Sequence, residues 1–462
     1  MRSNHLRGSW KHARFQERSR AAVHSFVLLL ALAATALTTV LPADAAHRNS
    51  WLIVSDIHLN PDKRNHEIEG HDPDPALLRS ALSAMKRVNP RPPVIVIAGD
   101  FLAHSFDDKL AIPTMRSIAR QLDRAFPASQ FVLVLGNEDS ACGDYGEPSG
   151  SAFLRAVAIA WEPLVDRGGA APNFVRTFVR DGFYVASLPR AGLRAVVIDD
   201  VFWSPRYRAG CAGSSENPSA TTFQELEASL PRGGRGNAWV FAHIPPGIDA
   251  YASSQIARNF LAVPLLQQRA KDRFLEVIGE PARHVKLVVA GHTHRFAFRL
   301  AGSQAAPVPI LLAPAISPIF GNAPSFLNVD VDEVGTIRHI DEWSLLDGRW
   351  QNIGGSASLH MRDASGPSVL ALQARLHSDA GIRSTFTRLY GGGAPSEINR
   401  KNWPVYWCVA TEFTTSGFRA CSSEGGIGIV TGKGIVAIVG ASILVLAALA
   451  GIVVARRKQR YR

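Results

Sequence analysis

The sequence predicts an α/β protein with a smaller C-terminal subdomain and one transmembrane helix near the end of the chain. Three observations predict this arrangement: short apolar runs that each end in polar residues, helical patterns between those runs, and a long uncharged apolar stretch close to the C-terminus. With 462 residues, of which 46% are hydrophobic, the chain is long and apolar enough to bury a full core.

Six apolar runs have the length and composition of buried strands. They are short, rich in Val, Ile and Leu, and lack the alternation expected of a strand with one face in water. We therefore expect these runs to form strands inside a sheet that is covered on both faces. The runs are residues 51–55, 94–98, 131–135, 195–198, 238–242 and 286–290.

A helix is predicted between the first two runs, over residues 74–88. Apolar residues recur there at helical spacing, and Asp74 followed by Pro75 is a start signal for a helix. Strands that alternate with helices are typical of open α/β sheets, in which functional groups gather in the loops past the carboxyl ends of the strands. The polar residues that follow the apolar runs occupy those loops.

The pattern changes beyond residue 325, where an alternating strand leads into a mixed polar region. A helical segment at 368–388 is followed by three glycines at 391–393, which break it. We expect a main domain over residues 46–335 and a C-terminal subdomain over 336–425.

Three aromatic residues of this predicted subdomain lie close together in the sequence. Packing inside the subdomain is the favoured interpretation, and contact with lipid headgroups is the alternative. They are Trp403, Tyr406 and Trp407.

The net charge of +11 lies mainly at the two ends of the chain. Residues 1–20 carry six basic residues against one acid, and residues 456–462 carry five basic residues and no acid. The rest of the chain is therefore close to neutral. Because binding to nucleic acid needs basic residues clustered on the folded body, we expect no nucleic-acid partner.

The apolar segments beside the charged ends predict a membrane topology. Residues 1–45 have the basic start, apolar stretch and small-residue cleavage pattern of a signal peptide, although an uncleaved anchor is the alternative. Residues 434–455 are uncharged and long enough to cross a bilayer, and the basic tail 456–462 follows at once. We expect a single-pass membrane protein whose main domain is extracytoplasmic, either periplasmic or extracellular, and whose C-terminus is cytoplasmic.

The four cysteines fit an oxidising compartment, because all of them fall in the segment predicted to be exported. Two disulfides are plausible, and three connectivities are open. On proximity alone we favour Cys142 with Cys211 and Cys408 with Cys421. None of the four has the spacing of a zinc site.

Polar clusters at the ends of five apolar runs contain residue types that bind metals. A single Asp or His after a strand is more often a cap or a hydrogen-bonding residue, so each cluster is weak evidence by itself. Together they supply seven oxygen and nitrogen ligands that one sheet edge could gather. The seven are Asp56, His58, Asp100, Asn137, His243, His292 and His294.

This mixture of ligands suits a pair of divalent cations. Two metals about 3.5–4 Å apart need a bridging carboxylate, with imidazole and carboxamide ligands to complete each shell. Imidazole together with carboxylate favours Zn, with Fe or Mn as alternatives, over Mg or Ca.

In this order the clusters resemble the DxH, GD, GN, H and GHxH motifs of the calcineurin-like metallophosphoesterase superfamily, over about residues 51–330. The resemblance implies a four-layer fold, in which two sheets are sandwiched between helices. It also implies that a hydroxide bridging the two metals attacks phosphorus. By motif, Asp100 would bridge the metals, Asp56, His58 and His294 would hold the first, and Asn137, His243 and His292 the second.

Further motifs are similar to those of the acid sphingomyelinase-like phosphodiesterases. His104 stands four residues after Asp100, as in the GDxxxH of that branch, and residues 243–247 and 317–326 match two of its other segments. The resemblance implies an extracytoplasmic phosphoester or phosphoanhydride as substrate. Sphingomyelin-like lipids, nucleotides and polyphosphate all remain open, and the oligomeric state is not indicated.

Glu138 departs from the superfamily pattern, which commonly has His after the GN motif. A carboxylate there repels an anionic phosphate unless it is protonated, so we expect His104 or a protonated Glu138 to serve as the catalytic acid. The alternative functions are an endopolyphosphatase or nucleotide phosphohydrolase of the same fold. An alternative from a functional class other than enzymes is a catalytically weakened, membrane-anchored binding protein.

Overall fold

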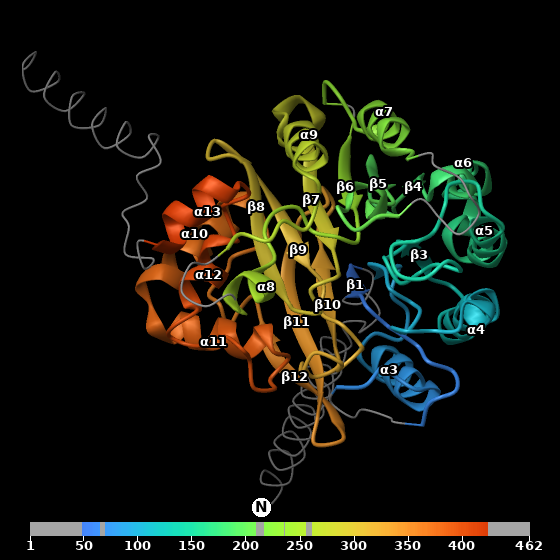
Figure 1. Ribbon diagram of the computed structural model, residues 1–462, viewed down its shortest axis with the longest axis horizontal. Coiled ribbons are helices and arrows are strands. Elements are labelled where there is room, and N and C mark those ends of the chain that lie inside the picture. Colours follow the sequence, from blue (N-terminus) through green and yellow to red (C-terminus); the bar gives the residue numbers. More distant parts are fainter. Residues whose placement is uncertain (1–48, 65–69, 209–216, 235, 256–260, 424–462) are drawn as a thin grey trace, which may run out of the picture. The chain divides into compact units, whose positions relative to one another are not determined.

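Two six-stranded sheets form the centre of the chain in this computed structural model (Figure 1). The structure describes residues 49–64, 70–208, 217–234, 236–255 and 261–423. Almost all of them belong to one unit that begins at Trp51. The predicted signal peptide (1–45), transmembrane helix (434–455) and basic tail lie outside the described residues.

The first sheet combines three parallel strands with an antiparallel extension. Strands β1, β2 and β3 pair in parallel, so their carboxyl ends lie at one edge. Strand β10 lies on the other side of β1, and β11 and β12 continue the sheet in antiparallel pairing. The bounds are β1 Ser50–Val54, β2 Val94–Ile97, β3 Gln130–Leu133, β10 Ser325–Val331, β11 Ile337–Leu346 and β12 Arg349–Gly355, in the order β12-β11-β10-β1-β2-β3.

The second sheet has the same mixed character. Strands β5, β6, β7 and β9 run parallel, and the two edge strands β4 and β8 are antiparallel to their neighbours. The bounds are β4 Tyr184–Ser187, β5 Leu193–Val197, β6 Asn237–Phe241, β7 Val285–Ala290, β8 Ala297–Ser303 and β9 Ala306–Leu312, in the order β4-β5-β6-β7-β9-β8.

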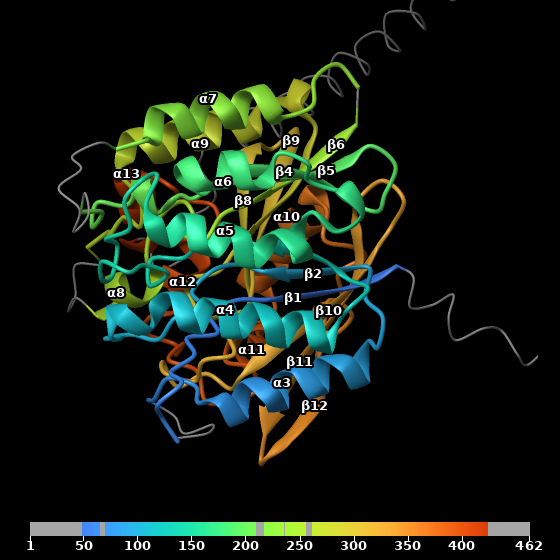
Figure 2. The same ribbon diagram turned by 90° about the vertical axis from the view of Figure 1, so that its right-hand side faces the viewer.

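Helices flank the sheets on both sides. Helices α3, α4, α5 and α6 lie on one side, which faces the viewer in Figure 2, and α10 to α13 lie on the opposite side (Figures 1 and 2). The bounds are α3 Pro75–Val88, α4 Asp108–Ala125, α5 Ala152–Val165, α6 Phe174–Asp181, α7 Ser219–Ser229, α8 Ala250–Gln255, α9 Gln268–Gly279, α10 Gly366–Ser378, α11 Ala380–Tyr390, α12 Trp403–Cys408 and α13 Thr415–Ser423. Short 3-10 helices lie at Arg167–Gly169, Val201–Trp203 and Pro281–Arg283.

Helix α3 begins where the sequence predicts. The Asp74 carboxylate accepts the backbone N–H groups of Ala76 and Leu77 at 2.8 and 3.0 Å, and Pro75 occupies the first turn. A cap of this kind stabilises a helix by about 1 kcal/mol. The apolar residues at helical spacing, including Leu78 and Met85, are buried.

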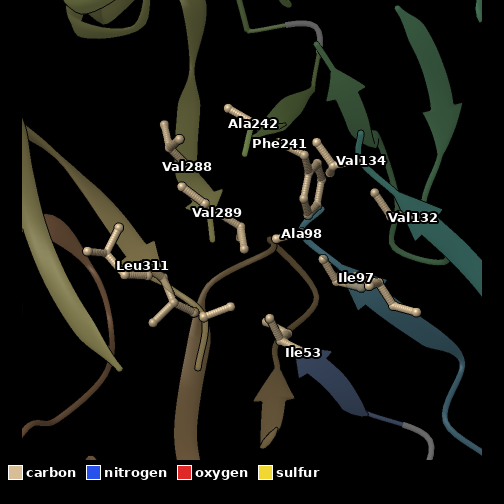
Figure 3. Close-up of a cluster of buried hydrophobic side chains, with 14 of the residues drawn as sticks. Ile53, Ile97, Ala98, Val132, Val134, Phe241, Ala242, Val288, Val289 and Leu311 are labelled. Carbon is tan, nitrogen blue, oxygen red and sulfur yellow. The ribbon is translucent and has the colours of Figure 1, made fainter. Parts of the chain in front are cut away.

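The core lies between the two sheets, as Figure 3 shows. Ile53 and Ile97 of the first sheet meet Phe241, Val289 and Leu311 of the second, and all five are at most 2% exposed. Burying one such side chain stabilises the fold by about 1.5–3 kcal/mol. Both faces of each central strand are covered, which explains the continuous apolar runs in the sequence.

The prediction of two-sided α/β sheet is confirmed, since all six apolar runs form strands. The predicted helix at 368–388 is wrong in one respect: it is two helices, α10 and α11. Asp379 separates them, because its extended backbone ends α10 and its carboxylate accepts the N–H groups of Gly381 and Ile382 to start α11. The hairpin β11–β12 was not predicted.

One predicted disulfide is present, between Cys408 and Cys421. The other expected pair includes Cys211, which lies outside the described residues. The subdomain boundary at residue 336 stays a prediction; beyond it, β11 and β12 hydrogen-bond in continuity with β10. Within the described ranges, no helix combines the length and the hydropathy needed to cross a membrane.

Candidate metal centre

All seven predicted ligand residues lie at the carboxyl ends of parallel strands. Asp56 and His58 follow β1, and Asp100 and Asn137 follow β2 and β3 of the same sheet. The other three follow strands of the second sheet, with His243 after β6 and both His292 and His294 after β7. Because parallel strands end at a common edge, the two sheets bring the seven side chains together.

The first cluster consists of Asp56, His58 and His294, all of them buried. The two Nε2 atoms of His58 and His294 lie 3.1 Å apart. Oδ1 of Asp56 lies 3.8 Å from Nε2 of His58 and 3.5 Å from Nε2 of His294. Three ligand atoms thus surround one point.

The second cluster consists of Asp100, His243 and His292, with Asn137 beside them. Nε2 of His243 lies 3.1 Å from Oδ2 of Asp100 and 3.2 Å from Oδ1 of Asn137. Nδ1 of His292 lies 2.9 Å from the same amide oxygen. Oδ2 of Asp100 is also 3.5 Å from Nε2 of His58, so this carboxylate oxygen belongs to both clusters.

In two of the imidazoles, a hydrogen bond to a backbone carbonyl fixes which ring nitrogen faces the clusters. Nδ1 of His58 donates to the carbonyl of Leu102 at 2.9 Å, and Nδ1 of His243 donates to the carbonyl of Ala98 at 2.7 Å. Each of these two rings therefore presents its Nε2 to the clusters. The amide of Asn137 is fixed similarly, since its Nδ2 donates to Asp144 at 2.8 Å and leaves Oδ1 facing His243.

With their imidazoles neutral, as metal binding requires, the clusters contain mostly acceptors that face one another. Buried acceptors without donors between them are costly, and a cation that accepts their lone pairs removes that cost. Imidazole nitrogens, carboxylate oxygens and one amide oxygen, divided between two clusters with a shared carboxylate, fit two divalent metal ions.

The backbone at the centre is strained. Five of the seven predicted ligand residues have positive φ, a region that costs about 1–3 kcal/mol for each residue other than glycine and collects at functional sites. The φ values are 48° for Asp56, 46° for His58, 54° for Asp100, 67° for His292 and 59° for His294.

Two glycines are required by close packing around the ligands. A Cβ on Gly99, whose φ is +97°, would collide with the imidazole of His243. A Cβ on Gly136 would collide with the carboxylate of Asp100. The glycines of the GD and GN motifs thus allow the two ligand loops to approach each other.

The ionisation of the buried ligands is strongly shifted. Burial alone would raise the pKa of the Asp100 carboxyl, but the charge and hydrogen bond of His243 together with the charge of His58 hold it well below its usual range. Burial and the charge of His243 lower the pKa of His292 to about 3. Burial and the charge of His58 hold the pKa of His294 well below its usual value, so both rings are neutral, as metal ligands must be.

His104 lies beside the first cluster, and its ring stacks on that of His58 with the centroids 4.2 Å apart. Its Nδ1 donates to Oδ1 of Asp72 at 3.0 Å, and its Nε2 lies 3.9 Å from Oε1 of Glu138. Burial opposes the charged imidazole, but the hydrogen bond and charge of Asp72, with the charge of Glu138, raise the pKa of His104 to about 9.

Glu138 lies between the second cluster and His104. Its backbone N–H donates to Oδ1 of Asp100 at 2.8 Å. Burial, followed by the charges of Asp100 and Asp144, raises the pKa of the Glu138 carboxyl to about 8. Both predicted candidates for the catalytic acid, His104 and Glu138, line the same cavity as Asp100, Asn137 and His292.

Several aspartates that support the site were not predicted from the sequence. Asp72 holds His104, Asp144 orients the amide of Asn137, and Asp200 accepts the backbone N–H groups of His243 and Ile244. Asp72 and Asp144 lie in loops, where nothing in the sequence marks a polar residue as a partner of a ligand. Asp200 stands three residues after the end of β5, as Asp100 does after β2, and this was a signal that could have identified it.

A family model described as calcineurin-like phosphoesterase matches residues 51–296, more than half of the chain. The chain therefore belongs to the calcineurin-like phosphoesterase family, a family of hydrolases that act on phosphoric esters. This confirms the resemblance found in the motifs.

Among curated proteins, the chain is similar to acid sphingomyelinase-like phosphodiesterase 3b of Mus musculus, at 26% identity over 255 residues that cover 53% of this chain and 52% of that protein. It is 24% identical over 308 residues to the Homo sapiens protein of the same name, covering 60% of this chain and 64% of the relative. Cyclic GMP-AMP phosphodiesterase SMPDL3A of Bos taurus is 22% identical over 254 residues, covering 53% and 52%. The chain thus spans about half the length of two of these relatives.

The chain is also similar to a solved structure, a dimetal phosphatase from Danio rerio. The sequences are 14% identical, the TM-score is 0.42, and the match covers 66% of this chain and 99% of that one.

Proposed function

We propose that the protein is a metal-dependent phosphodiesterase that holds its substrate phosphate over two divalent cations. The observation that carries the proposal is the position of the Asp100 carboxylate, whose Oδ2 lies 3.5 Å from Nε2 of His58 and 3.1 Å from Nε2 of His243. A shared carboxylate is what a pair of metals about 3.5–4 Å apart requires. Asp56, His58 and His294 would hold one cation, and Asn137, His243 and His292 the other.

A metal pair bound there would polarise the phosphoryl oxygens and make water a nucleophile at neutral pH. We assign zinc to the site, with iron or manganese as the alternatives, because imidazole and carboxylate ligands favour these ions over magnesium and calcium. Diester substrates are supported by the curated relatives, which include acid sphingomyelinase-like phosphodiesterase 3b and cyclic GMP-AMP phosphodiesterase SMPDL3A.

The residues of this chain have separable tasks around the phosphate. His104 is placed to give a proton to the leaving oxygen, because Asp72 holds its Nδ1–H and leaves Nε2 at the cavity. The backbone N–H of Glu138 holds Oδ1 of Asp100, so that Oδ2 stays between the two clusters. Because most of the ligand residues are buried, cations bound among them would be shielded from bulk water. This shielding would strengthen the electrostatic effect of the cations on the phosphate.

The test is turnover of bis(p-nitrophenyl) phosphate by the full-length chain. We expect hydrolysis that a chelator abolishes and that zinc, manganese or iron restores. Asp100→Asn is expected to lose at least about 100-fold in kcat, since removal of one major electrostatic contribution costs this much in comparable sites. Asp330→Asn, a change on β10, is the control and leaves the rate unchanged. A fully active Asp100→Asn variant would overturn the proposal.

A second candidate function, a membrane-anchored binding protein with weakened catalysis, is favoured by Glu138. Its carboxylate stands where relatives commonly have His, and its Oε1 lies 3.9 Å from Nε2 of His104. The two functions predict opposite results for Glu138→His. An enzyme that uses Glu138 loses rate, as we expect, whereas a weakened enzyme gains rate.

We also propose an extracytoplasmic catalytic domain, anchored by residues 434–455 and preceded by a signal peptide at 1–45. The disulfide between Cys408 and Cys421 supports an oxidising compartment. Protease added to intact cells tests the topology. We expect it to digest an epitope in the catalytic domain and to spare an epitope fused to residue 462. Digestion of the second epitope alone would reverse the proposed orientation.

A further inference from the structure

The side-chain amide of Asn137 has to present its oxygen, and not its nitrogen, to the second ligand cluster. Its Oδ1 lies 2.9 Å from Nδ1 of His292 and 3.2 Å from Nε2 of His243, so a cation bound there would meet the amide oxygen. An amide carries an acceptor on one side and donors on the other, and only the acceptor can bind a cation. Rotation of this amide by half a turn would therefore remove one ligand from the cluster.

Asp144 determines which side of the amide faces the cluster. Nδ2 of Asn137 donates to Oδ1 of Asp144 at 2.8 Å. Because a carboxylate only accepts, the amide oxygen has to point the other way. The Asp144 side chain is 28% exposed, so packing alone does not fix its position. The orientation of the amide thus depends on the groups that hold this carboxylate.

Arg206 holds the other oxygen of the Asp144 carboxylate. Nη2 of Arg206 donates to Oδ2 of Asp144 at 2.7 Å, the length of a charge-assisted hydrogen bond. The guanidinium also lies over the ring of Tyr145, with its Cζ 4.4 Å from the ring centroid. Tyr145 is buried, and its backbone N–H donates to the carbonyl of Asn137 at 2.9 Å. Arg206 therefore contacts two residues that each hydrogen-bond to Asn137.

These contacts join loops that belong to different sheets. Asn137 follows β3 of the first sheet, whereas Arg206 belongs to the segment that follows β5 of the second. Arg208 strengthens the junction, because its backbone N–H donates to the carbonyl of Tyr145 at 3.1 Å and its Nη2 donates to the carbonyl of Asp144 at 2.8 Å. The second ligand cluster also draws on both sheets, so this junction holds the loops in the relative position that the cluster needs.

The ion pair of Arg206 and Asp144 is placed for a role in the site rather than for stability. The arginine side chain is 65% exposed. Exposed ion pairs contribute little to folding, because water screens the charges and two flexible side chains lose freedom. Both residues nevertheless line the same cavity as Asn137 and His292. The position of the pair at the metal centre therefore calls for another explanation than its contribution to folding.

We propose that Arg206 is a positioning residue for the second cation, because it holds Asp144 against the amide of Asn137. The inference rests on the proposed function and assigns a further residue to its metal centre. The chain of contacts from Arg206 through Asp144 to Asn137, with consecutive hydrogen bonds of 2.7 and 2.8 Å, carries it. Residues that orient the ligands of a metal commonly set the affinity of the site, although they do not touch the metal.

Zinc affinity, measured on the full-length chain by competition with a chromophoric chelator, tests the proposal. We expect the wild type to bind zinc in two steps, and Asn137→Ala identifies the step that belongs to the second cluster. Arg206→Met should weaken that step at least about tenfold and leave the other step unchanged, since loss of a residue that orients a ligand costs about 10- to 100-fold in metal affinity. Arg338→Met is the matched control. It also breaks an ion pair of 2.7 Å, with Asp332, but lies on β11, which carries none of the ligands.

A double-mutant cycle shows whether Arg206 acts through Asp144. Asp144→Ala should weaken the same zinc step, and adding Arg206→Met to it should cost no more than about a further twofold, because residues in one hydrogen-bonded chain are not additive. Additive losses would overturn the proposal. So would a raised KM for bis(p-nitrophenyl) phosphate that excess zinc does not reverse, since the guanidinium would then contact the substrate itself.

The outcomes separate this inference from the proposed function. If the wild type binds two zinc ions and hydrolyses the diester, but Arg206→Met binds both ions as tightly, the inference is overturned and the proposed function stands. Equal weakening of both steps, or a large fall in the urea midpoint of metal-free Arg206→Met, would make Arg206 a general stabilising residue and would also overturn the inference. If the zinc-loaded wild type hydrolyses no phosphodiester, the proposed function itself fails.

Discussion

Asp72 holds His104 with both oxygens of its carboxylate. Oδ1 lies 3.0 Å from Nδ1 of the imidazole, and Oδ2 accepts the backbone N–H of the same residue at 2.9 Å. Because a carboxylate only accepts, Nδ1 carries the proton, and the ring is fixed with Nε2 toward Glu138 and the cavity. Asp72 comes from the loop before α3, so this relationship joins two loops of the catalytic edge.

Asp72→Asn is expected to slow substrates with poor leaving groups. The amide no longer stabilises a protonated imidazole, so kcat for an alkyl leaving group should fall about 10- to 100-fold, while p-nitrophenolate, which needs no proton, is nearly unaffected. Kinetics with both leaving groups measure this, and Asp62→Asn in the same loop is the control. Equal slowing of both substrates would show that Asp72 has only a structural role.

Gly99→Ala is expected to lose the metal centre. The new Cβ would collide with the imidazole of His243, and positive φ adds strain for any residue with a side chain. The matched control is Gly168→Ala, because Gly168 also has positive φ, +69°, but no heavy atom would lie within 4 Å of its Cβ. Metal content per chain, measured after dialysis, should fall only in Gly99→Ala. Equal metal content in the two variants would refute the packing argument.

Asp139→Ala is expected to destabilise the metal-free chain by about 3 kcal/mol. The carboxylate accepts the N–H groups of Phe101 and Leu102 at 2.7 and 3.1 Å and that of Gly136 at 2.9 Å, so it ties the loops of Asp100 and Asn137 together. Leaving such donors buried without partners costs about 1–3 kcal/mol each, and structural relaxation recovers part of this. Urea unfolding measures the change in the free energy of unfolding. The control is Asp123→Ala, at an exposed position, which should change that free energy by no more than about 0.5 kcal/mol. A loss below about 1 kcal/mol would mean that water replaces the carboxylate.

Replacing both Cys408 and Cys421 by serine should destabilise the C-terminal helices. The disulfide closes a loop across 13 residues between α12 and α13, and removing a bridge over a loop of this length costs about 3 kcal/mol. Urea unfolding measures this loss, and turnover of bis(p-nitrophenyl) phosphate under native conditions should stay unchanged because the predicted metal ligands follow other elements. A loss of turnover as well would show that the bridge supports the catalytic domain as a whole.

The strands and the ligand loops follow from the sequence for simple physical reasons. A strand buried on both faces leaves a continuous apolar run such as 94–98, and the first polar residues after it fall at the sheet edge. Asp100 and Asn137 were found in this way. The glycines before them belong to the same motifs, but only the structure shows that their absent Cβ atoms make room for His243 and Asp100.

The supporting residues and the cavity depend on tertiary contacts that local patterns do not contain. Asp72 and His104 are 32 residues apart, and only the folded loops bring them together. The aromatic residues Trp403, Tyr406 and Trp407 were predicted to pack within the subdomain, and they also line a cavity whose other walls come from β8 and α10. Periodicity identifies a buried face but not the empty space beside it.

The most direct measurement is the anomalous scattering of crystals grown with zinc. We predict two peaks about 3.5–4 Å apart on either side of Oδ2 of Asp100, one among Asp56, His58 and His294 and the other among Asn137, His243 and His292. A single peak, or peaks that Asp100 does not touch, would contradict it.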